Sequence, residues 1–233
     1  MSRKDSMVLA VPVLVMFSVI CISVRDCDAQ KLHKRIISTI FWVGEKSGPE
    51  NEYIPNDVSA WDGYWMDHFG GIDDPDNRNG YFPAGFTPKE NPFYFALPYN
   101  DIGDDGERKP GALDLIPWAR CKSYTETESA CKNRWVRIVK DGVEAYAQWE
   151  DVGPFYEDDA DYVFGWCRPK NKHGAGAGID VSPAVADYLG LEGIDEVDWE
   201  FVDFEEVPEG PWKLIVTKSQ IEWAEGAKKS MRR

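Results

Sequence analysis

Two aspartates stand out from the general acidity of this sequence because of their neighbours. Asp151 lies in the segment 149–155, Trp-Glu-Asp-Val-Gly-Pro-Phe, and Asp180 lies in the segment 178–183, Gly-Ile-Asp-Val-Ser-Pro. Two carboxyl groups that meet in a partly apolar groove titrate at different pH values, so one donates a proton while the other accepts one. Acid–base cleavage of a glycosidic bond requires that pair of roles.

A structural role accounts for the same two residues. Asp180 can accept hydrogen bonds from backbone amides near a helix start, and Asp151 can stabilise the turn at Gly153-Pro154. Both lie at boundaries of predicted elements, where side chains can converge on a cleft while the backbone stays rigid. Position alone leaves the catalytic and the structural interpretation open.

The elements that must position these aspartates are mostly strands. Period-two alternation and β-branched or aromatic residues predict strands at residues 35–43, 92–97, 134–139, 143–150, 197–202 and 212–217. Asp141-Gly142 stands between two of these segments, which predicts a hairpin with a tight turn.

One helix is predicted with both of its ends. Ser182 can cap it, Pro183 suits its first position, residues 184–189 give it an apolar face, and Gly190 can end it. A second helix is predicted at residues 218–228. Short strands with one well-defined helix favour a mainly β barrel over an alternating α/β sheet.

The N-terminal stretch is predicted to be a signal peptide, residues 1–29. Arg3 and Lys4 precede an apolar run at residues 7–24, and small residues near Ala29 suit cleavage. The length of the run leaves an uncleaved membrane anchor as the alternative. Cleavage predicts a secreted or periplasmic protein with no stable membrane insertion. No linker or repeat follows, so residues 30–233 are predicted to form one domain with an insertion at about 44–91.

Charge and composition narrow the partners. The chain has 26 Lys and Arg against 41 Asp and Glu, a net charge of −15, which disfavours nucleic acid and anionic lipid. Aromatic residues make up 13% of the chain, including 10 Trp, which rules out a disordered or fibrous chain. Neutral or amino-bearing partners such as polysaccharides remain, and a monomer is expected.

No motif predicts a cofactor or a metal. The sequence has no Gly-x-Ser-x-Gly elbow, phosphate loop, dinucleotide fingerprint or His-Glu-x-x-His. Residues 73–80 look calcium-like, but Arg78 stands where an oxygen ligand is needed, so a solvated turn is expected. In an oxidising compartment Cys121 and Cys131 can close a short disulfide loop, with Cys167 left over.

A family resemblance adds to these observations. Residues 149–155 followed by 178–190 resemble the paired signature of double-psi β-barrel domains of the RlpA and expansin kind. Ser-Thr-Ile-Phe-Trp at 38–42, Phe-Ala-Leu-Pro at 95–98 and Val-Asp-Trp-Glu-Phe at 197–201 are similar to other segments of these barrels. The resemblance implies a six-stranded double-psi β-barrel with one or two helices and a long insertion after the first strand.

The resemblance also implies roles for single residues. Asp180 matches the acid that protonates the glycosidic oxygen in lytic transglycosylases and in family 45 cellulases. Asp151 matches an aspartate of the expansin groove, and Thr39 matches the first-strand threonine. Two departures stand out: RlpA enzymes commonly carry a histidine near the Gly-Pro-Phe turn, and Val43 stands where the cellulases place their base, with Glu45 the nearest carboxylate.

Aromatic side chains are the candidates for sugar stacking, because a flat ring suits the apolar face of a pyranose. The segment 156–177 is longer than in compact relatives, and Tyr156 and Trp166 are predicted to bind substrate there together with Thr39. Four further aromatic residues are possible stacking faces, with core packing as the alternative: Tyr162, Phe164, Trp61 and Trp65.

The predicted function is a secreted protein that cleaves cell-wall polysaccharide, in the manner of a lytic transglycosylase or a glycoside hydrolase, with Asp180 as general acid and Asp151 or Glu45 available to activate water. The alternative is a non-catalytic, expansin-like module that binds glycan or loosens the wall in the same groove. A third possibility is a domain whose acidic face meets a basic protein partner.

Overall fold

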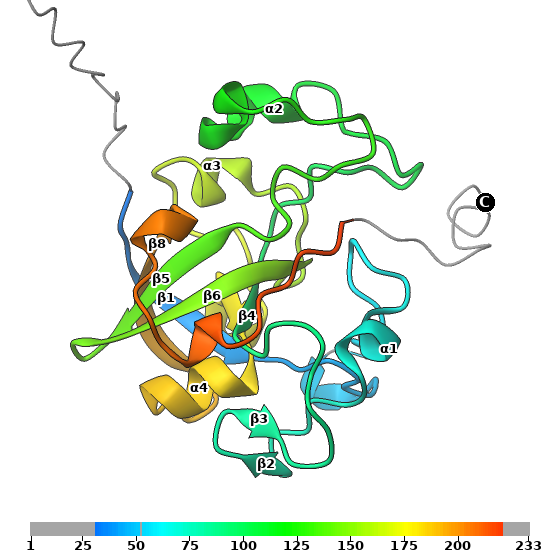
Figure 1. The fold of residues 1–233 in the computed structure, drawn as a ribbon. Coiled ribbons are helices and arrows are strands. Elements are labelled where there is room, and N and C mark those ends of the chain that lie inside the picture. The colour runs from blue at the N-terminus through cyan, green and yellow to red at the C-terminus, as the bar shows by residue number, and fades with distance from the viewer. Residues whose placement is uncertain (1–30, 52, 221–233) are drawn as a thin grey trace, which may run out of the picture.

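A closed barrel of six strands forms the centre of the molecule (Figure 1). The computed structural model describes residues 31–51 and 53–220 of the chain. The strand order is β1-β7-β4-β6-β5-β8; the pairs β1–β7 and β4–β6 are parallel and the other pairs are antiparallel. The strands are β1 His33–Ile40, β4 Tyr94–Leu97, β5 Trp135–Lys140, β6 Val143–Val152, β7 Ile179–Val181 and β8 Asp195–Val202. The predicted mainly β class with a six-stranded barrel is confirmed.

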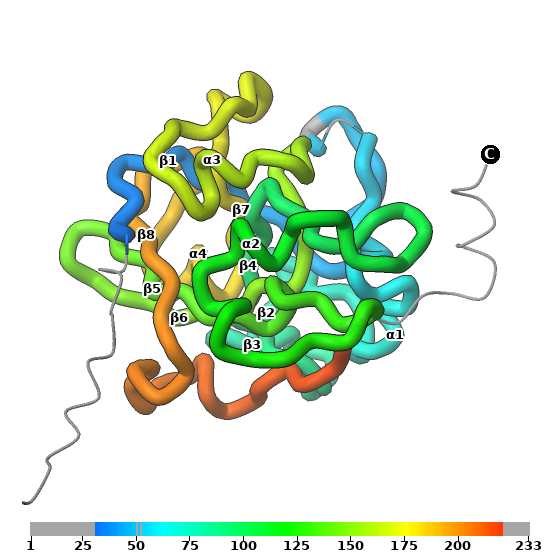
Figure 2. The backbone as a smooth tube through the Cα atoms, turned by 90° about the horizontal axis from the view of Figure 1, so that it is seen from above, coloured from blue at the N-terminus to red at the C-terminus, as the bar shows by residue number. Residues whose placement is uncertain are grey.

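The remaining elements are short. A small antiparallel pair stands apart from the barrel, and the described helices each span seven residues or fewer. The pair is β2 Arg78–Asn79 with β3 Phe82–Pro83. The α-helices are α1 Trp65–Phe69, α2 Ala112–Leu115, α3 Ala160–Val163 and α4 Pro183–Leu189. The 3-10 helices are Pro49–Asn51, Pro117–Cys121, Gly174–Gly176, Phe204–Glu206 and Pro211–Lys213. Figures 1 and 2 show α2 and its flanking loops crossing one end of the barrel.

Two local predictions are confirmed because their signals act over a few residues. Asp141 and Gly142 both have positive φ, 50° and 83°, which is the backbone of a tight turn between β5 and β6. The Ser182 hydroxyl accepts a hydrogen bond from the Val185 amide at 3.3 Å and caps α4. Gly190 ends α4 with φ of 68°.

The sixth predicted strand was wrong. Residues 212–217 form no strand; Pro211–Lys213 is a 3-10 helix and the chain then runs across the outside of the barrel. The barrel is already closed by β5–β8 and β1–β8, so it offers this segment no free edge. The sixth strand is instead β7, whose three residues are too few for a periodic pattern.

Two predicted segments fall wholly or mostly outside the described residues. The signal peptide at residues 1–29 lies there entirely. Of the predicted second helix at 218–228, only residues 218–220 are described, and they are not helical.

Two hydrophobic cores hold the fold together. The larger one fills the barrel and includes Phe95, Trp149 and Val181. The smaller one consists of Phe41, Val43, Trp65, Phe69, Tyr94 and Ala96, and lies between the barrel wall and residues 44–91, the segment that connects β1 to β4. That connecting segment is called the insertion below, and it packs on the outer face of β4.

The expected solvated turn at residues 73–80 is partly wrong. Asp73 is fully buried; it forms an ion pair with Arg78 and accepts a hydrogen bond from the Tyr94 hydroxyl at 2.9 Å. The Arg78 guanidinium supplies a positive charge at this loop, and the Asp73 contacts hold the loop on the second core.

The expected disulfide is also absent from the described chain. Cys121 is exposed, Cys131 is buried, and neither they nor Cys167 are bonded to another cysteine. Burial raises the pKa of the Cys131 thiol well above its usual value, so this cysteine behaves as a small core residue.

Candidate functional site

Strand register places the two aspartates in one row across the barrel wall. Thr39 of β1 pairs with Asp180 of β7, Asp180 pairs with Ala96 of β4, and Ala96 pairs with Asp151 of β6. Paired residues on neighbouring strands direct their side chains to the same face, and each strand is about 4.8 Å from the next. The Asp151 and Asp180 backbones are therefore roughly 10 Å apart, and Ala96 lies between them in the row.

This row faces outward, toward the insertion. Along β4, Phe95 and Leu97 pack in the barrel core, whereas Tyr94 and Ala96 pack in the second core. The pairing of β4 with β6 shifts between Phe95 and Ala96, so that no β4 residue pairs with Glu150. Such an irregularity re-aims the side chains that follow it, and here it turns Asp151 onto the face of Ala96.

Asp180 is a partly exposed residue, and its carboxyl group is closely surrounded. The Thr39 hydroxyl donates a hydrogen bond to its Oδ1 atom. Its Oδ2 atom lies over Gly153, where an added Cβ atom would approach to 3.3 Å, so glycine leaves the room that this carboxyl group occupies. Burial raises the pKa of Asp180 to about 7; the Thr39 hydrogen bond opposes that rise, and the charges of Asp151 and Glu45 add to it.

Asp151 is more deeply engaged than Asp180. Its Oδ1 atom accepts hydrogen bonds from the Ala60 amide at 2.7 Å and the Val152 amide at 2.8 Å. Burial raises the pKa of Asp151 to about 7, against the opposing effect of these two amides and of Lys132. Because Ala60 belongs to the insertion, this carboxyl group also fastens the insertion to the end of β6.

A third carboxyl group, Glu45, acts on the same site from the first turn after β1. It is largely buried, and its Oε2 atom accepts a hydrogen bond from the Asn56 amide nitrogen at 2.7 Å. Burial raises the pKa of Glu45, and its charge in turn raises the pKa of Asp180. Val43 stands where family 45 cellulases place their catalytic base. Glu45, two residues later, supplies a carboxyl group close enough to raise the pKa of Asp180.

The Gly-Pro-Phe turn forms one rim of the site together with a histidine that the sequence analysis missed. The Phe155 and His173 rings have centroids 5.2 Å apart. The neighbouring Gly174 is in contact with both sides of this rim: an added Cβ atom there would lie 3.5 Å from Phe155 and 3.6 Å from Thr39. Phe155 and His173 are 18 positions apart in the sequence, so no local motif could have linked them.

Only some of the predicted substrate-binding residues lie near Asp180. Thr39 lies beside Asp180, and Tyr156 lies on the turn that follows Gly153 with about a third of its surface exposed. Trp166 is 83% exposed but stacks with the Lys31 ammonium group, 4.6 Å from the ring centroid. Lys31 precedes Thr39 by eight residues, about 25 Å of extended chain, so Trp166 stands near the other end of β1.

The other aromatic candidates belong to the core. Trp61 and Trp65 were predicted as possible exposed stacking faces, and this was wrong, because both are buried. Tyr162 is fully buried and accepts a hydrogen bond from the Trp199 indole at 2.9 Å, and Phe164 packs against the barrel core. These four aromatic side chains therefore contribute to core packing.

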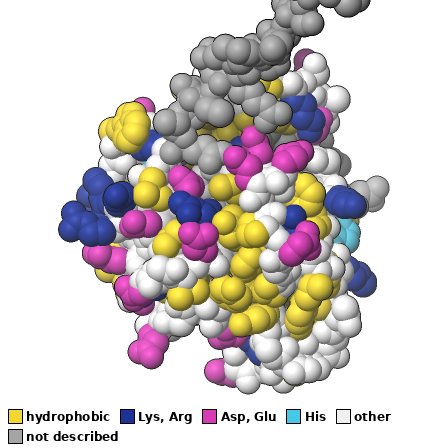
Figure 3. All heavy atoms as spheres, turned by 60° about the vertical axis from the view of Figure 1, so that its left-hand side comes forward, with side chains coloured by type: hydrophobic (Ala, Val, Ile, Leu, Met, Phe, Trp, Pro, Cys, Tyr) yellow, Lys and Arg dark blue, Asp and Glu magenta, His cyan; other side chains and the backbone are white. Residues whose placement is uncertain are grey.

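Metal and membrane features are absent from the described part of the chain. No group of three or more His, Cys, Asp or Glu side chains is arranged there to hold a metal ion. Within the same residues no helix is long and apolar enough to cross a bilayer. On the face shown in Figure 3, acidic and basic side chains are mixed with apolar ones, so the net negative charge is not gathered on that face.

Comparison with known proteins adds no family to this description. No protein-family model matches the sequence, and a search of curated proteins finds no match. The functional argument therefore depends on the row of side chains itself.

Proposed function

We propose that this protein cleaves the glycosidic bonds of a cell-wall polysaccharide, with Asp180 as the general acid. The observation that carries the proposal is the setting of Asp180: a partly exposed residue whose carboxyl pKa is raised by burial to about 7, with the charges of two further acidic side chains adding to the rise. A carboxyl group that keeps its proton near neutral pH can donate it to a leaving oxygen.

The reaction begins with transfer of the Asp180 proton to the glycosidic oxygen as the bond from that oxygen to the anomeric carbon breaks. In a lytic reaction, a hydroxyl group of the same sugar closes on the anomeric carbon and returns its proton to Asp180. In a hydrolytic reaction, water attacks instead and a second carboxylate takes its proton. Glu45 or Asp151 would fill that second role, and Asp151 already has one oxygen engaged by two backbone amides.

The type of β-barrel and the cellular location of the protein are part of the same proposal. We infer that the barrel is of the double-psi kind found in RlpA-like and expansin-like domains, since its two parallel strand pairs and the Asp180 row agree with the motifs at 149–155 and 178–190. We further propose that the protein acts as a secreted or periplasmic monomer on polysaccharide, peptidoglycan among them.

A second candidate is a non-catalytic module that binds glycan over the same row of side chains. The observation that favours it is the engagement of Asp151, which holds the insertion in place as a structural residue would. In this version Asp180, Thr39 and the Phe155 rim contact the glycan without breaking it.

Incubation of the purified protein with peptidoglycan, cellulose and xyloglucan, followed by mass spectrometry of the soluble fraction, distinguishes the two. We expect soluble fragments, with anhydro-sugar ends if the reaction is lytic, and loss of release in Asp180→Asn. The matched control is Asp187→Asn, an aspartate on α4 outside the row, which should retain release. Glycan retention without any product would support the binding module, and full activity of Asp180→Asn would remove the proposed acid.

A further inference from the structure

The C-terminal segment crosses the outside of the barrel and is hydrogen-bonded to it at several points. The Asn91 amide donates to the Thr217 hydroxyl at 2.9 Å and the Asn91 side chain donates to the Trp212 carbonyl at 3.0 Å. Two further points lie toward the end of the segment. We call residues 211–219 the strap. At the first point the Gln148 side chain accepts a hydrogen bond from the Thr217 amide at 2.9 Å and donates one to the Thr217 carbonyl at 3.1 Å. At the second point the Asn133 side chain donates to the Ser219 carbonyl at 2.8 Å. The strap thus ends over the turn that leads into β5.

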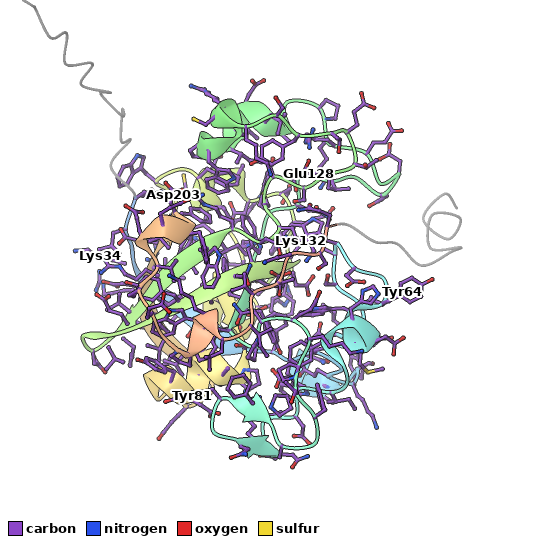
Figure 4. The ribbon with its side chains drawn as sticks, viewed as in Figure 1. Lys34, Tyr64, Tyr81, Glu128, Lys132 and Asp203 are labelled. Atoms are coloured by element: carbon purple, nitrogen blue, oxygen red, sulfur yellow. The ribbon has the colours of Figure 1, made fainter. Side chains whose placement is uncertain are left out.

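Beneath the end of the strap lies a group of ionisable side chains, all of them buried except His68, whose side chain is 34% exposed. We call Asp62, His68, Glu90, Lys132 and Glu150 the latch cluster. The Lys132 ammonium group lies 2.5 Å from Glu150 Oε2, and both side chains are about 1% exposed. The Ser219 hydroxyl donates to Glu90 Oε1 at 2.8 Å and lies 3.4 Å from the Lys132 ammonium group. Lys132, labelled in Figure 4, lies on the side of the barrel that the strap and the insertion share.

The latch cluster joins three parts of the molecule. Glu150 belongs to β6 and Lys132 to the turn before β5, whereas Glu90 closes the insertion just before β4. Asp62 and His68, from the insertion, are paired at 2.7 Å. Ser219 brings the strap to the same place, so any change in the charge of the cluster acts on all three contacts.

The charges of the cluster do not balance. Glu90, Glu150 and Asp62 bring three carboxyl groups to a single buried ammonium group, and His68 faces Asp62 and Glu90 at the edge of the cluster. Within the described residues, Glu90 Oε2 and Glu150 Oε1 are buried and have no hydrogen-bond partner. A buried, unpaired carboxylate oxygen is costly, and a bound proton removes that cost.

We propose that the latch cluster acts as a pH-dependent latch. When Glu90 or Glu150 is protonated, the cluster holds the strap and the insertion against the barrel. When that proton is lost, both segments loosen. No metal is invoked, because the carboxyl groups are not arranged for one among the described residues. The ligand that fits two unpartnered carboxylate oxygens beside one ammonium group is the proton.

The direction of the effect follows from burial. Burial raises the pKa of Glu150 to about 7 and also raises the pKa of Glu90, whereas Lys132 opposes the rise in both. The closed latch therefore binds its proton more tightly than the open one, and its stability is greatest at acidic pH. Stability is lost as the pH rises through about 7, by up to about tenfold in the opening equilibrium for each pH unit.

The latch is linked to the Asp180 row through one turn of the insertion. The Ser59 hydroxyl accepts a hydrogen bond from the Asp62 amide at 3.0 Å, and the adjacent Ala60 amide donates to Asp151. Release of Asp62 from the cluster therefore loosens the turn that holds Asp151. Opening of the latch at higher pH is therefore expected to loosen the position of Asp151 in the row. The latch itself does not depend on the proposed reaction.

Hydrogen–deuterium exchange of the full protein at pH 5 and pH 8, corrected for the intrinsic exchange rate at each pH, tests the latch without any substrate. We expect the amides of residues 211–219 and 59–68 to open at least about tenfold more often at pH 8 than at pH 5, while α4 keeps the same protection. Equal protection of the strap at the two pH values would overturn the proposal.

Two variants assign the effect to the cluster. Glu90→Gln keeps an acceptor for Ser219 and removes one of the two proton sites, and Glu150→Gln removes the other. Each variant should reduce the pH dependence of the strap, and the double variant should lose most of it. Glu192→Gln, a change at an exposed glutamate, and Asp180→Asn should both keep it. The full wild-type response in both Glu90→Gln and Glu150→Gln would refute the proposal, and if the variants do not fold, the wild-type comparison still decides.

Discussion

Burial raises the pKa of Asp180 to about 7, so a large share of the molecules hold this proton at neutral pH. The charges of Asp151 and Glu45 add to the rise and the hydrogen bond from Thr39 opposes it, while Gly153 leaves room for the carboxyl group. Ala96, between the two aspartates, adds no more than a methyl group to the row. The chemistry at this scale depends on small residues as much as on acidic ones.

A larger side chain at residue 96 should disturb the site. Ala96→Val adds two methyl groups between Asp151 and Asp180, in a strand that accepts β-branched residues, and should lower glycan product release by about tenfold or more. The matched control is Ala147→Val, which overpacks the barrel core away from the row and should cost about 1–3 kcal/mol of stability but little activity. Unchanged release by Ala96→Val would contradict the role given to the row.

At the scale of elements, the elements set by adjacent residues could be predicted from the sequence, whereas those set by residues far apart in the chain could not. The β5–β6 hairpin and α4 could be predicted because a tight turn and a helix cap are set by adjacent residues. The strand β7 could not, because it has three residues and finds its partner β1 across 141 positions. The motif around Asp180 pointed to the residue, but the register that aligns it with Thr39 and Asp151 emerges only from the barrel.

The candidate site shows the same division. Asp180, Asp151, Thr39 and Glu45 could be named from motifs, and the structure brings the first three into one row. His173 could not be named, since only the folded loop brings it to Phe155. Exposure was the least predictable property: nothing local distinguishes buried Trp61 from exposed Trp166.

The strap is an element whose backbone is satisfied by side chains in place of a neighbouring strand. Gln148→Leu would leave the Thr217 amide and carbonyl without partners and remove one of the two acceptors of the Asn91 side-chain amide, which also donates to the Trp212 carbonyl. We expect a loss of about 3 kcal/mol in the free energy of unfolding, measured in urea. Gln220→Leu, at an exposed position, should change it by less than about 0.5 kcal/mol. A stable Gln148→Leu protein would show that the strap adds little to the fold.

At the scale of the whole molecule, buried acidic groups set the response to pH. Burial raises the pKa of Glu150, Asp151 and Asp180 to about 7, so the folded state binds protons more tightly than the unfolded state does. The stability due to these groups is present below about pH 4 and is lost as the pH rises to about 7. The net charge of −15 acts in the same direction, because repulsion between carboxylates grows with pH.

Unfolding in urea across a pH series tests this directly. We expect the free energy of unfolding to fall between pH 5 and pH 8 by up to about 8 kcal/mol, since each of the three groups loses about 1.4 kcal/mol per pH unit over roughly two units. Asp180→Asn should show a shallower fall, because one of the three groups no longer titrates. A free energy that rises over this interval would mean that these carboxyl groups are ionised in the folded protein.

The proposed acid role of Asp180 requires a carboxyl group whose pKa lies near 7 beside a second carboxyl group. Carbon-13 NMR titration of aspartate carboxyl groups, with the Asp180 signal assigned by its loss in Asp180→Asn, measures this. We predict a midpoint near 7, a lower midpoint in Asp151→Asn because a neighbouring charge is removed, and a higher one in Thr39→Val because a hydrogen bond to the carboxylate is lost. A midpoint close to 4 that neither substitution moves would contradict the account.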